Sequence, residues 1–426
     1  MAIAATRFAR RRSAVAFLVV CITFLLVEAD SRYLGTQTVY DVFIYQCYAR
    51  AFWQGTAATQ AAGPNLVICS AFWDSPAPRF HTLPREYPAP AVLIFSLPLL
   101  LSYGSYAASY AVLLGLLLIV AAGLIAWRGP PAAAIAFVLY TLLAGWKFAL
   151  ERYDLVPGLL VLLMAVCAQH RRYAAATLAL AAATLLKGFP AILLPALLIA
   201  IHHDQGRWRP AYAFLFAGAV AVGLLPFALL APDQLLAPLR YAAQRPIHSS
   251  SVAGLLLWLT GDFGAGIRTQ FSYGACNVLS AHSNLLSLLS TMLLVLGLGR
   301  AAWRQWHGWD SLPQSALLVL TLLLVTNKVF SPQYVLWLLP LAAVYEGLRW
   351  RWLLAALVVN LDFEFVWLCN VEPTSLLHPL AAHNPVFGSS LLATLALLAQ
   401  DATFCAIALW YLLRPPRQSA AAPPSA

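Results

Sequence analysis

The sequence predicts an all-α polytopic membrane protein with about 12 (about 11 to 13) transmembrane helices. Of its 426 residues, 62% are hydrophobic and only 10% are charged, and the mean hydropathy is +0.76. Apolar runs recur from Ser13 to Leu413, and many approach the roughly 20 residues that a helix needs to cross a bilayer. A soluble domain carries about 25% charged residues, so the composition excludes that class.

The arginines predict the orientation, because cytoplasmic loops concentrate Lys and Arg. Arg7 and the run 10–12 keep the N-terminus inside, and two crossings between successive basic turns keep each turn inside as well. Both termini are then expected in the cytoplasm. This rule gives crossings near 14–29, 106–127, 132–148, 154–170, 173–187, 188–202, 210–231, 284–300, 313–327, 333–348, 352–369 and 389–413.

The apolar stretch 89–103 is predicted to be a re-entrant or interfacial helix on the outer side. It contains Pro90 and Pro98, and it is shorter than the roughly 20 residues of a crossing. If it crosses instead, the count rises to about 13 and the arginine pattern breaks. The short run 252–260 is interpreted in the same way.

We expect a single transmembrane domain over 1–413, with outer loops at 28–105 and 232–283. The Pro- and Ala-rich segment 414–426 is predicted to be a disordered cytoplasmic tail. The N-terminal arginines and apolar run resemble a cleavable signal peptide, but the polytopic context favours a retained signal anchor. The net charge of +10 follows from the cytoplasmic arginines, so it does not indicate nucleic acid as a partner.

Four of the seven cysteines lie on the predicted outer side, and their spacing matches no metal or redox motif. A bridge between Cys47 and Cys69 is one state that an oxidising compartment permits. Small buried thiols are the state that we expect.

The three lysines, Lys147, Lys187 and Lys328, fall at the outer ends of predicted crossings, against the positive-inside bias. Snorkelling to the interface explains any one of them, whereas the three together predict a site for a phosphate at membrane depth. Glycine or proline interrupts the apolar run beside Lys187 and Lys328, as happens where a broken helix lines a polar cavity. Arg152 and Asp154 join the same outer rim.

Five motifs, in their order along the chain, resemble the bacterial family 87 glycosyltransferases between about residues 39 and 341. They are "DVFIYQCYARAFWQG" at 41–55, "REYPAP" at 85–90, "KGFP" at 187–190, "QRPIHSSS" at 244–251 and "SPQYVLWLLPL" at 331–341. Two features depart from the family pattern. Ala89 separates two prolines that are usually adjacent, and Phe189 stands where tyrosine is common.

This resemblance implies a GT-C-type bundle and a membrane enzyme similar to alpha-mannosyltransferases. Such an enzyme moves a hexose, with mannose expected, from a polyprenyl-phosphate sugar donor to a glycolipid or glycan acceptor, with inversion. The active site is then expected on the extracytoplasmic side of the bacterial inner membrane, in contact with membrane lipid. No cofactor is expected, and a divalent metal stays open.

An attacking sugar hydroxyl needs a carboxylate to take its proton, and Asp41 follows the first predicted crossing. We predict Asp41 as the general base, with an N-cap for a helix beginning at Val42 as its alternative role. The leaving lipid phosphate needs fixed cations, for which the predicted ligands are Lys187, Lys328, Arg245, His248, Arg152 and Lys147. An exposed loop position is the alternative interpretation for His248.

The predicted substrate-binding residues are Glu86, Tyr87, Tyr45, Asp154 and Tyr334. Glu86 is expected either to contact a sugar hydroxyl or to pair with a neighbouring arginine.

Other polar and aromatic groups of the outer side have their own expected roles. Trp53 and Trp73, in the outer loop, are candidate platforms for a sugar ring. Asp362 and Glu364 are expected to face the protein interior and to pair with an outer-rim cation, since unpaired charges at membrane depth are costly. No His or Asp cluster supports a metal site there.

Two other classes fit the composition. A multi-pass transporter or flippase of a lipid-linked or polar solute would use the outer cations as part of a substrate path. It also needs polar residues at the midplane, which most of the crossings lack. A catalytically inactive scaffold would make no demand on Asp41.

Overall fold

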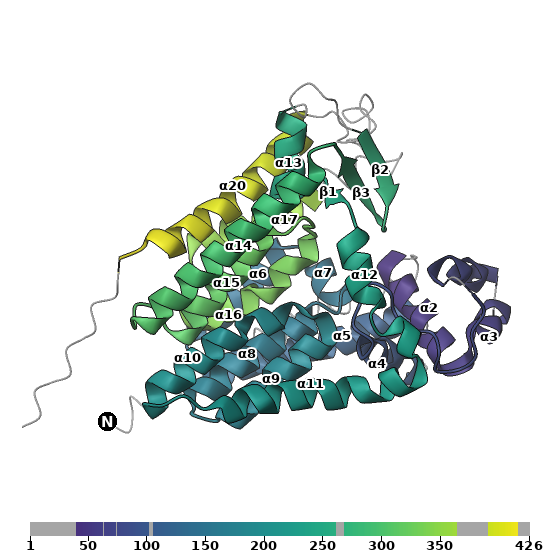
Figure 1. Ribbon diagram of the computed structural model, residues 1–426, viewed down its shortest axis with the longest axis horizontal. Helices are drawn as coiled ribbons and strands as arrows, with labels where there is room; N and C mark the ends of the chain where they lie inside the picture. The colour runs from purple at the N-terminus through teal and green to yellow at the C-terminus, as the bar shows by residue number, and fades with distance from the viewer. Residues whose placement is uncertain are drawn as a thin grey trace, which may run out of the picture. The chain divides into compact units, whose positions relative to one another are not determined.

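The computed structural model describes residues 40–62, 64–73, 75–101, 105–260, 268–363 and 391–415. Helices dominate these residues, and the strands are few and short (Figure 1), so the predicted helical membrane class is confirmed at this level. The predicted first crossing at 14–29, Glu364 and residues 416–426 of the predicted tail lie outside the described residues.

Four helices in the described part of the chain are long and apolar enough to cross a membrane. They are residues Tyr106–Trp127 of α5 (Tyr106–Arg128), α11 (Pro210–Leu230), α14 (Ser283–Trp306) and residues Leu395–Leu413 of α20 (Leu391–Leu413). The other predicted crossings that the structure describes are shorter or divided. The run predicted as 132–148, for example, ends as α6 at Leu143 and resumes as α7 at Trp146, after Gly145 with a φ of +88°.

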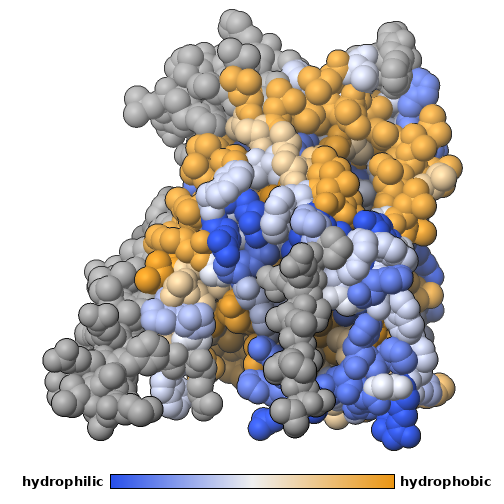
Figure 2. Space-filling view, turned by 90° about the vertical axis from the view of Figure 1, so that its left-hand side faces the viewer, coloured by the Kyte–Doolittle hydropathy of each residue, from blue (hydrophilic) through white to orange (hydrophobic). Residues whose placement is uncertain are grey.

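The side chains of α11 and α14 are mostly exposed although they are apolar. Phe214 and Leu229 of α11 are 74% and 76% exposed, and Leu296 of α14 is 68% exposed. Apolar residues form broad patches on one face of the molecule in Figure 2. Soluble proteins seldom expose contiguous apolar surface of this kind, and contact with lipid explains it.

The chain forms two compact units. The first comprises Met1–Ala191, Ala211–Arg245 and Leu339–Leu348, and the second comprises Ile192–Pro210, Pro246–Leu338 and Arg349–Ala426.

In the first unit, helices surround a buried aromatic and aliphatic core. Among the described residues, its elements besides α5 and α11 are α2 (Tyr40–Gln54), α3 (Thr56–Ala61), η1 (Pro64–Phe72), α4 (Ala91–Ser96), η2 (Leu97–Leu100), α6 (Pro131–Leu143), α7 (Trp146–Glu151), α8 (Leu155–Gln169), α9 (Tyr173–Lys187), η4 (Pro232–Gln234), α12 (Ala237–Gln244) and α16 (Leu339–Glu346). The short η3 (Phe189–Leu193) crosses the boundary between the two units, which falls after Ala191. The described part of the stretch predicted as an interfacial helix at 89–103 folds as α4 and η2, which together are too short to span.

A disulfide joins Cys47 of α2 to Cys69 of η1, so the expectation of two free thiols is wrong. Both cysteines are fully buried beside Leu66, Phe72 and Trp73. The bridge forms because the packing of η1 against α2 brings the two Cα atoms to 5.4 Å, within the usual range for a disulfide.

The second unit contains a three-stranded antiparallel sheet that the sequence did not predict. Its strand order is β1 (Ile247–His248), β3 (Ala275–Leu279), β2 (Arg268–Ser272). Tyr273 and Gly274, both with positive φ, form the turn between β2 and β3, as two-residue hairpin turns require. Besides α14 and α20, the described residues of this unit form the helices α10 (Leu194–Gln205), α13 (Val252–Leu259), α15 (Leu312–Thr326), η6 (Pro332–Trp337) and α17 (Trp350–Phe363).

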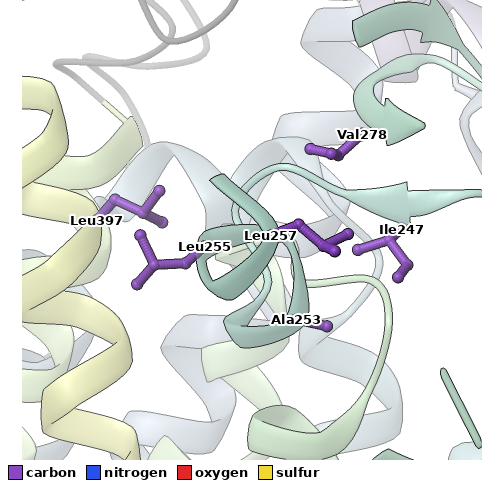
Figure 3. Packing of buried hydrophobic residues seen from close by; sticks show 6 residues of the cluster. All are labelled: Ile247, Ala253, Leu255, Leu257, Val278 and Leu397. Atoms are coloured by element: carbon purple, nitrogen blue, oxygen red, sulfur yellow. The ribbon is translucent and has the colours of Figure 1, made fainter. Parts of the chain in front are cut away.

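A small apolar cluster fixes α13 between the sheet and α20. In Figure 3, Leu255 of α13 faces Leu397 of α20, while Leu257 lies toward Ile247 of β1. The run predicted at 252–260 is therefore an eight-residue helix held by packing on both sides.

A buried ion-pair network joins three helix ends in the second unit. Arg304, 1% exposed, donates to both carboxylate oxygens of Asp310, at 2.8 and 3.1 Å, and Arg414 donates to the same carboxylate at 2.7 Å. Arg304 also donates to the carbonyl oxygens of Leu412 and Arg414. The end of α14, the start of α15 and the end of α20 therefore lie together, as expected for basic turns on one side of the membrane.

Candidate active site

Asp41 and Arg152 form an ion pair in the first unit. The side chains are 22% and 15% exposed, respectively, so the pair is partly shielded from solvent. Helix α2 begins at Tyr40, which places Asp41 in the first turn instead of at the cap of a helix starting at Val42. A carboxylate is stabilised there by the partial positive charge of a helix N-terminus.

Lys187 and Asp154 form a second ion pair, with the ammonium nitrogen 2.6 Å from Oδ1 of the carboxylate. Lys187 is the last residue of α9, and Gly188 ends that helix with a φ of +67° that favours glycine. Asp154 stands at the N-cap position of α8 and is fully buried, but its side chain does not cap that helix. Its carboxylate instead reaches Lys187 on the neighbouring helix.

An aromatic enclosure surrounds the Lys187 ammonium. The ammonium lies 4.9 Å from the ring centroid of Tyr153 and 5.5 Å from that of Tyr87, distances at which a cation is attracted to the ring. Tyr45 packs edge-on against both rings and stacks on Phe95 at 4.3 Å. The lysine charge is therefore held between one carboxylate and the faces of apolar rings.

The two predicted substrate tyrosines in this enclosure stay neutral. Burial raises the pKa of both Tyr45 and Tyr87 well above the usual value for tyrosine, and the charges of nearby acids and tyrosines raise it further, although the hydrogen bond with Tyr45 offsets part of the rise at Tyr87. Their hydroxyls therefore serve as hydrogen-bonding groups and not as bases near neutral pH.

Glu86 lies beside this enclosure and interacts with α12. The Tyr241 hydroxyl donates to a Glu86 carboxylate oxygen at 3.4 Å. Burial raises the pKa of Glu86, and the charge of Arg245 and the bond from Tyr241 partly offset that rise. Tyr241 was not singled out from the sequence, because a tyrosine on an exposed amphipathic helix carries no motif.

His248 and Lys328 meet in the second unit through their backbones. The N–H of His248 donates to the carbonyl oxygen of Lys328 at 2.8 Å, and the Nδ1 atom of His248 accepts from the N–H of Ser250 at 3.2 Å. This second bond leaves the proton of a neutral imidazole on Nε2. Two motifs about 80 residues apart, those of His248 and Lys328, are thus adjacent in the fold.

The structure gathers most of the predicted residues but not all in one unit. The first unit contains Asp41, Tyr45, Glu86, Tyr87, Arg152, Asp154, Lys187 and Arg245. The second unit contains His248, Lys328 and Tyr334. Tyr334 stacks on Trp337 at 4.2 Å. The side chain of Lys147 lies outside the described residues. Trp53 donates to the Ser96 hydroxyl at 2.7 Å and keeps 43% of its surface exposed.

The pattern of glycosyltransferase family 87 matches residues 86–332, more than half of the chain. The chain belongs to glycosyltransferase family 87. Together with its apolar helices, this membership identifies a membrane glycosyltransferase, which uses a sugar donor and an acceptor. No curated protein and no solved structure matches the chain.

The family 87 match includes most of the candidate site of this glycosyltransferase. Glu86, Arg152, Asp154, Lys187 and the His248–Lys328 pair lie inside the matched range, whereas Asp41, Tyr45 and Tyr334 lie outside it. Among the described residues, no group of three or more His, Cys, Asp or Glu side chains is placed to hold a metal ion.

Proposed function

We propose that this family 87 glycosyltransferase transfers a hexose, with mannose as the first candidate, from a polyprenyl-phosphate sugar to a glycolipid or glycan acceptor. The observation that carries the proposal is the proximity of a candidate base to a candidate phosphate ligand. Asp41 is paired with Arg152, and Asp154, two residues further along the chain, holds Lys187. The segment 152–154 therefore contacts both the candidate base, Asp41, and the candidate phosphate ligand, Lys187.

In the proposed reaction Asp41 is the general base. Its carboxylate takes the proton of the acceptor hydroxyl as the hydroxyl oxygen attacks the anomeric carbon of the donor. The new carbon–oxygen bond forms on the face opposite the phosphate, so the configuration inverts. The pairing with Arg152 favours the ionised carboxylate, which is the form that a base requires.

Lys187 is the proposed ligand for the leaving group. The bond between the anomeric carbon and the phosphate oxygen breaks, and the electron pair leaves with the polyprenyl phosphate. The lysine charge, confined by the rings of Tyr87 and Tyr153, acts on that developing charge more strongly than it would in water. Arg152, Arg245, His248, Lys328 and Lys147 remain proposed phosphate ligands, and Glu86, Tyr87, Tyr45, Asp154 and Tyr334 remain proposed substrate contacts.

The disulfide supports an extracytoplasmic site. Disulfides persist in oxidising compartments and are rare in the cytosol. Cys47 of the Cys47–Cys69 bridge lies on the same helix, α2, as Asp41. We therefore place α2 and its base on the outer side of a bacterial inner membrane, with both termini in the cytoplasm.

Transfer by an Asp41→Asn variant tests this function. The purified protein in nanodiscs would be given a synthetic polyprenyl-phosphate donor with a radiolabelled sugar, and the variant should lose about 10²-fold or more of the transfer rate. Asp233→Asn, a change of an exposed acid in η4, is the matched control and should transfer normally. Wild-type transfer by Asp41→Asn would exclude Asp41 as the base and direct the test to Glu86 or Asp154. Movement of the lipid donor across the bilayer without sugar transfer would favour a flippase.

A further inference from the structure

A buried polar group in the second unit contains none of the residues proposed above. Asp362, near the end of α17, is 2% exposed, and Gln400 and Asp401, in the middle of α20, are 0% and 5% exposed. Two carboxyl groups inside an apolar helix pair are costly without a compensating charge, so their surroundings need an explanation.

These side chains converge on Ser250. The Ser250 side chain bonds the Asp362 carboxylate, and the amide nitrogen of Gln400 donates to the carbonyl oxygen of Ser250 at 3.4 Å. The Gln400 side chain also bonds the Asp401 carboxylate, whose charge interacts with that of Asp362. The packing of Leu255 against Leu397, three residues before Gln400, fixes this arrangement from the apolar side (Figure 3).

Three buried acceptor oxygens of this group receive no hydrogen bond from the described residues. They are Oδ1 of Asp362, Oε1 of Gln400 and Oδ2 of Asp401. No lysine or arginine is seen to pair with Asp362 in the described ranges, so the pairing of Asp362 with an outer-rim cation stays a prediction. Buried acceptors are almost always satisfied in folded proteins, and the described part of the chain supplies no positively charged or hydrogen-donating partner for these three oxygens.

We propose that Asp362, Asp401 and Gln400, with the Ser250 hydroxyl, bind one divalent cation. Carboxylate, amide and hydroxyl oxygens are the ligands that hard cations such as Ca²⁺ prefer, and water completes their coordination. Two ionised carboxylates balance a double positive charge, which makes the buried site neutral. The proposal is independent of the proposed sugar transfer.

A bound cation would also hold the segment that carries His248. Ser250 is two residues from His248, and Ser251 caps α13 through the N–H of Gly254. The cation would therefore join α17, α20 and the 248–251 segment through one set of ligands and stabilise all three against separation.

Binding can be measured without an activity assay. The purified full-length protein would be treated with a chelator, and then titrated with Mn²⁺ by electron paramagnetic resonance and with Ca²⁺ by thermal unfolding. We expect one saturable site and a rise in Tm with Ca²⁺. Asp362→Asn and Asp401→Asn should each weaken binding by more than the about 10- to 100-fold typical of outer-shell changes. Asp204→Asn, at an exposed position of α10, should bind as the wild type does.

Two results would overturn the proposal. The first is binding that survives both asparagine substitutions, which would locate the cation elsewhere. The second is a folded wild type that binds no cation and whose Tm depends on pH, where each of the two asparagine substitutions removes that pH dependence. That result would show that the two carboxyl groups share a proton and take no metal ion.

Discussion

The Lys187 ammonium lies 2.6 Å from the Asp154 carboxylate, and the two residues are 33 positions apart in the chain. The pair joins the end of α9 to the start of α8, which are neighbours in an antiparallel hairpin closed by Arg171 with a φ of +59°. The lysine charge is therefore fixed by packing, whereas a snorkelling lysine would be free to follow the membrane surface.

Loss of this lysine should affect both stability and transfer. Lys187→Met leaves the Asp154 charge buried and should reduce the free energy of unfolding by about 3 to 5 kcal/mol. The double variant Lys187→Met/Asp154→Leu should recover most of that stability and still lack transfer. Denaturant unfolding in detergent and the radiolabel assay measure the two effects. If the Lys187→Met protein is as stable as the wild type, the Asp154 pair contributes no stability, and Lys187 is better explained as a lysine that snorkels to the membrane surface.

The chemistry of the charge at Lys187 is a separate question. Lys187→Arg preserves the charge but changes its geometry, so donor use should fall less than in Lys187→Ala. Steady-state transfer at varied donor concentration compares them, and equal rates for Ala and wild type would contradict a phosphate ligand.

The stability contributed by Glu86 should fall as the pH rises. Burial raises the pKa of Glu86 above its ordinary value of 4.5, so the folded protein keeps this proton at pH values where the unfolded chain has lost it. Glu86→Gln should therefore gain Tm relative to the wild type as the pH rises above about 4.5. Thermal unfolding across this range, with Asp233→Asn as the exposed control, measures the difference. A difference that shrinks with rising pH would mean that Arg245 and Tyr241 outweigh the burial.

The Cys47–Cys69 bridge should contribute about 3 kcal/mol, the amount that chain entropy predicts for a loop closed across 22 residues. Cys47→Ser/Cys69→Ser should lower the Tm and remove its response to a reductant. Cys167→Ser, which changes a free thiol, should keep that response. A wild type whose Tm does not change under reduction would contradict this contribution.

The orientation of α11 can be tested with exposed positions on either side of it. Asp204 precedes α11 and Asp233 follows it, and both are exposed. In a background without the five other cysteines, Asp233→Cys should react with an impermeant maleimide in spheroplasts. Asp204→Cys should react only after permeabilisation. The reverse pattern would invert the topology, and labelling of both from outside would mean that α11 does not cross.

The sequence by itself determined the membrane class and the glycosyltransferase family. Hydropathy and motif order are properties of consecutive residues, so they can be determined without knowledge of the fold. They also located α8, α9 and α11 to within a few residues, since each is a continuous apolar run between polar turns.

Only the tertiary structure decided which charges meet. The sequence placed Arg152, Asp154 and Lys187 on one rim but did not show that Arg152 pairs with Asp41 and Asp154 with Lys187. Partners of buried charges are set by long-range packing, which one sequence does not specify. The same holds for the Cys47–Cys69 bridge, which depends on the approach of η1 to α2. It also holds for the sheet near His248, whose strands are too short, at two to five residues, to show an alternating pattern.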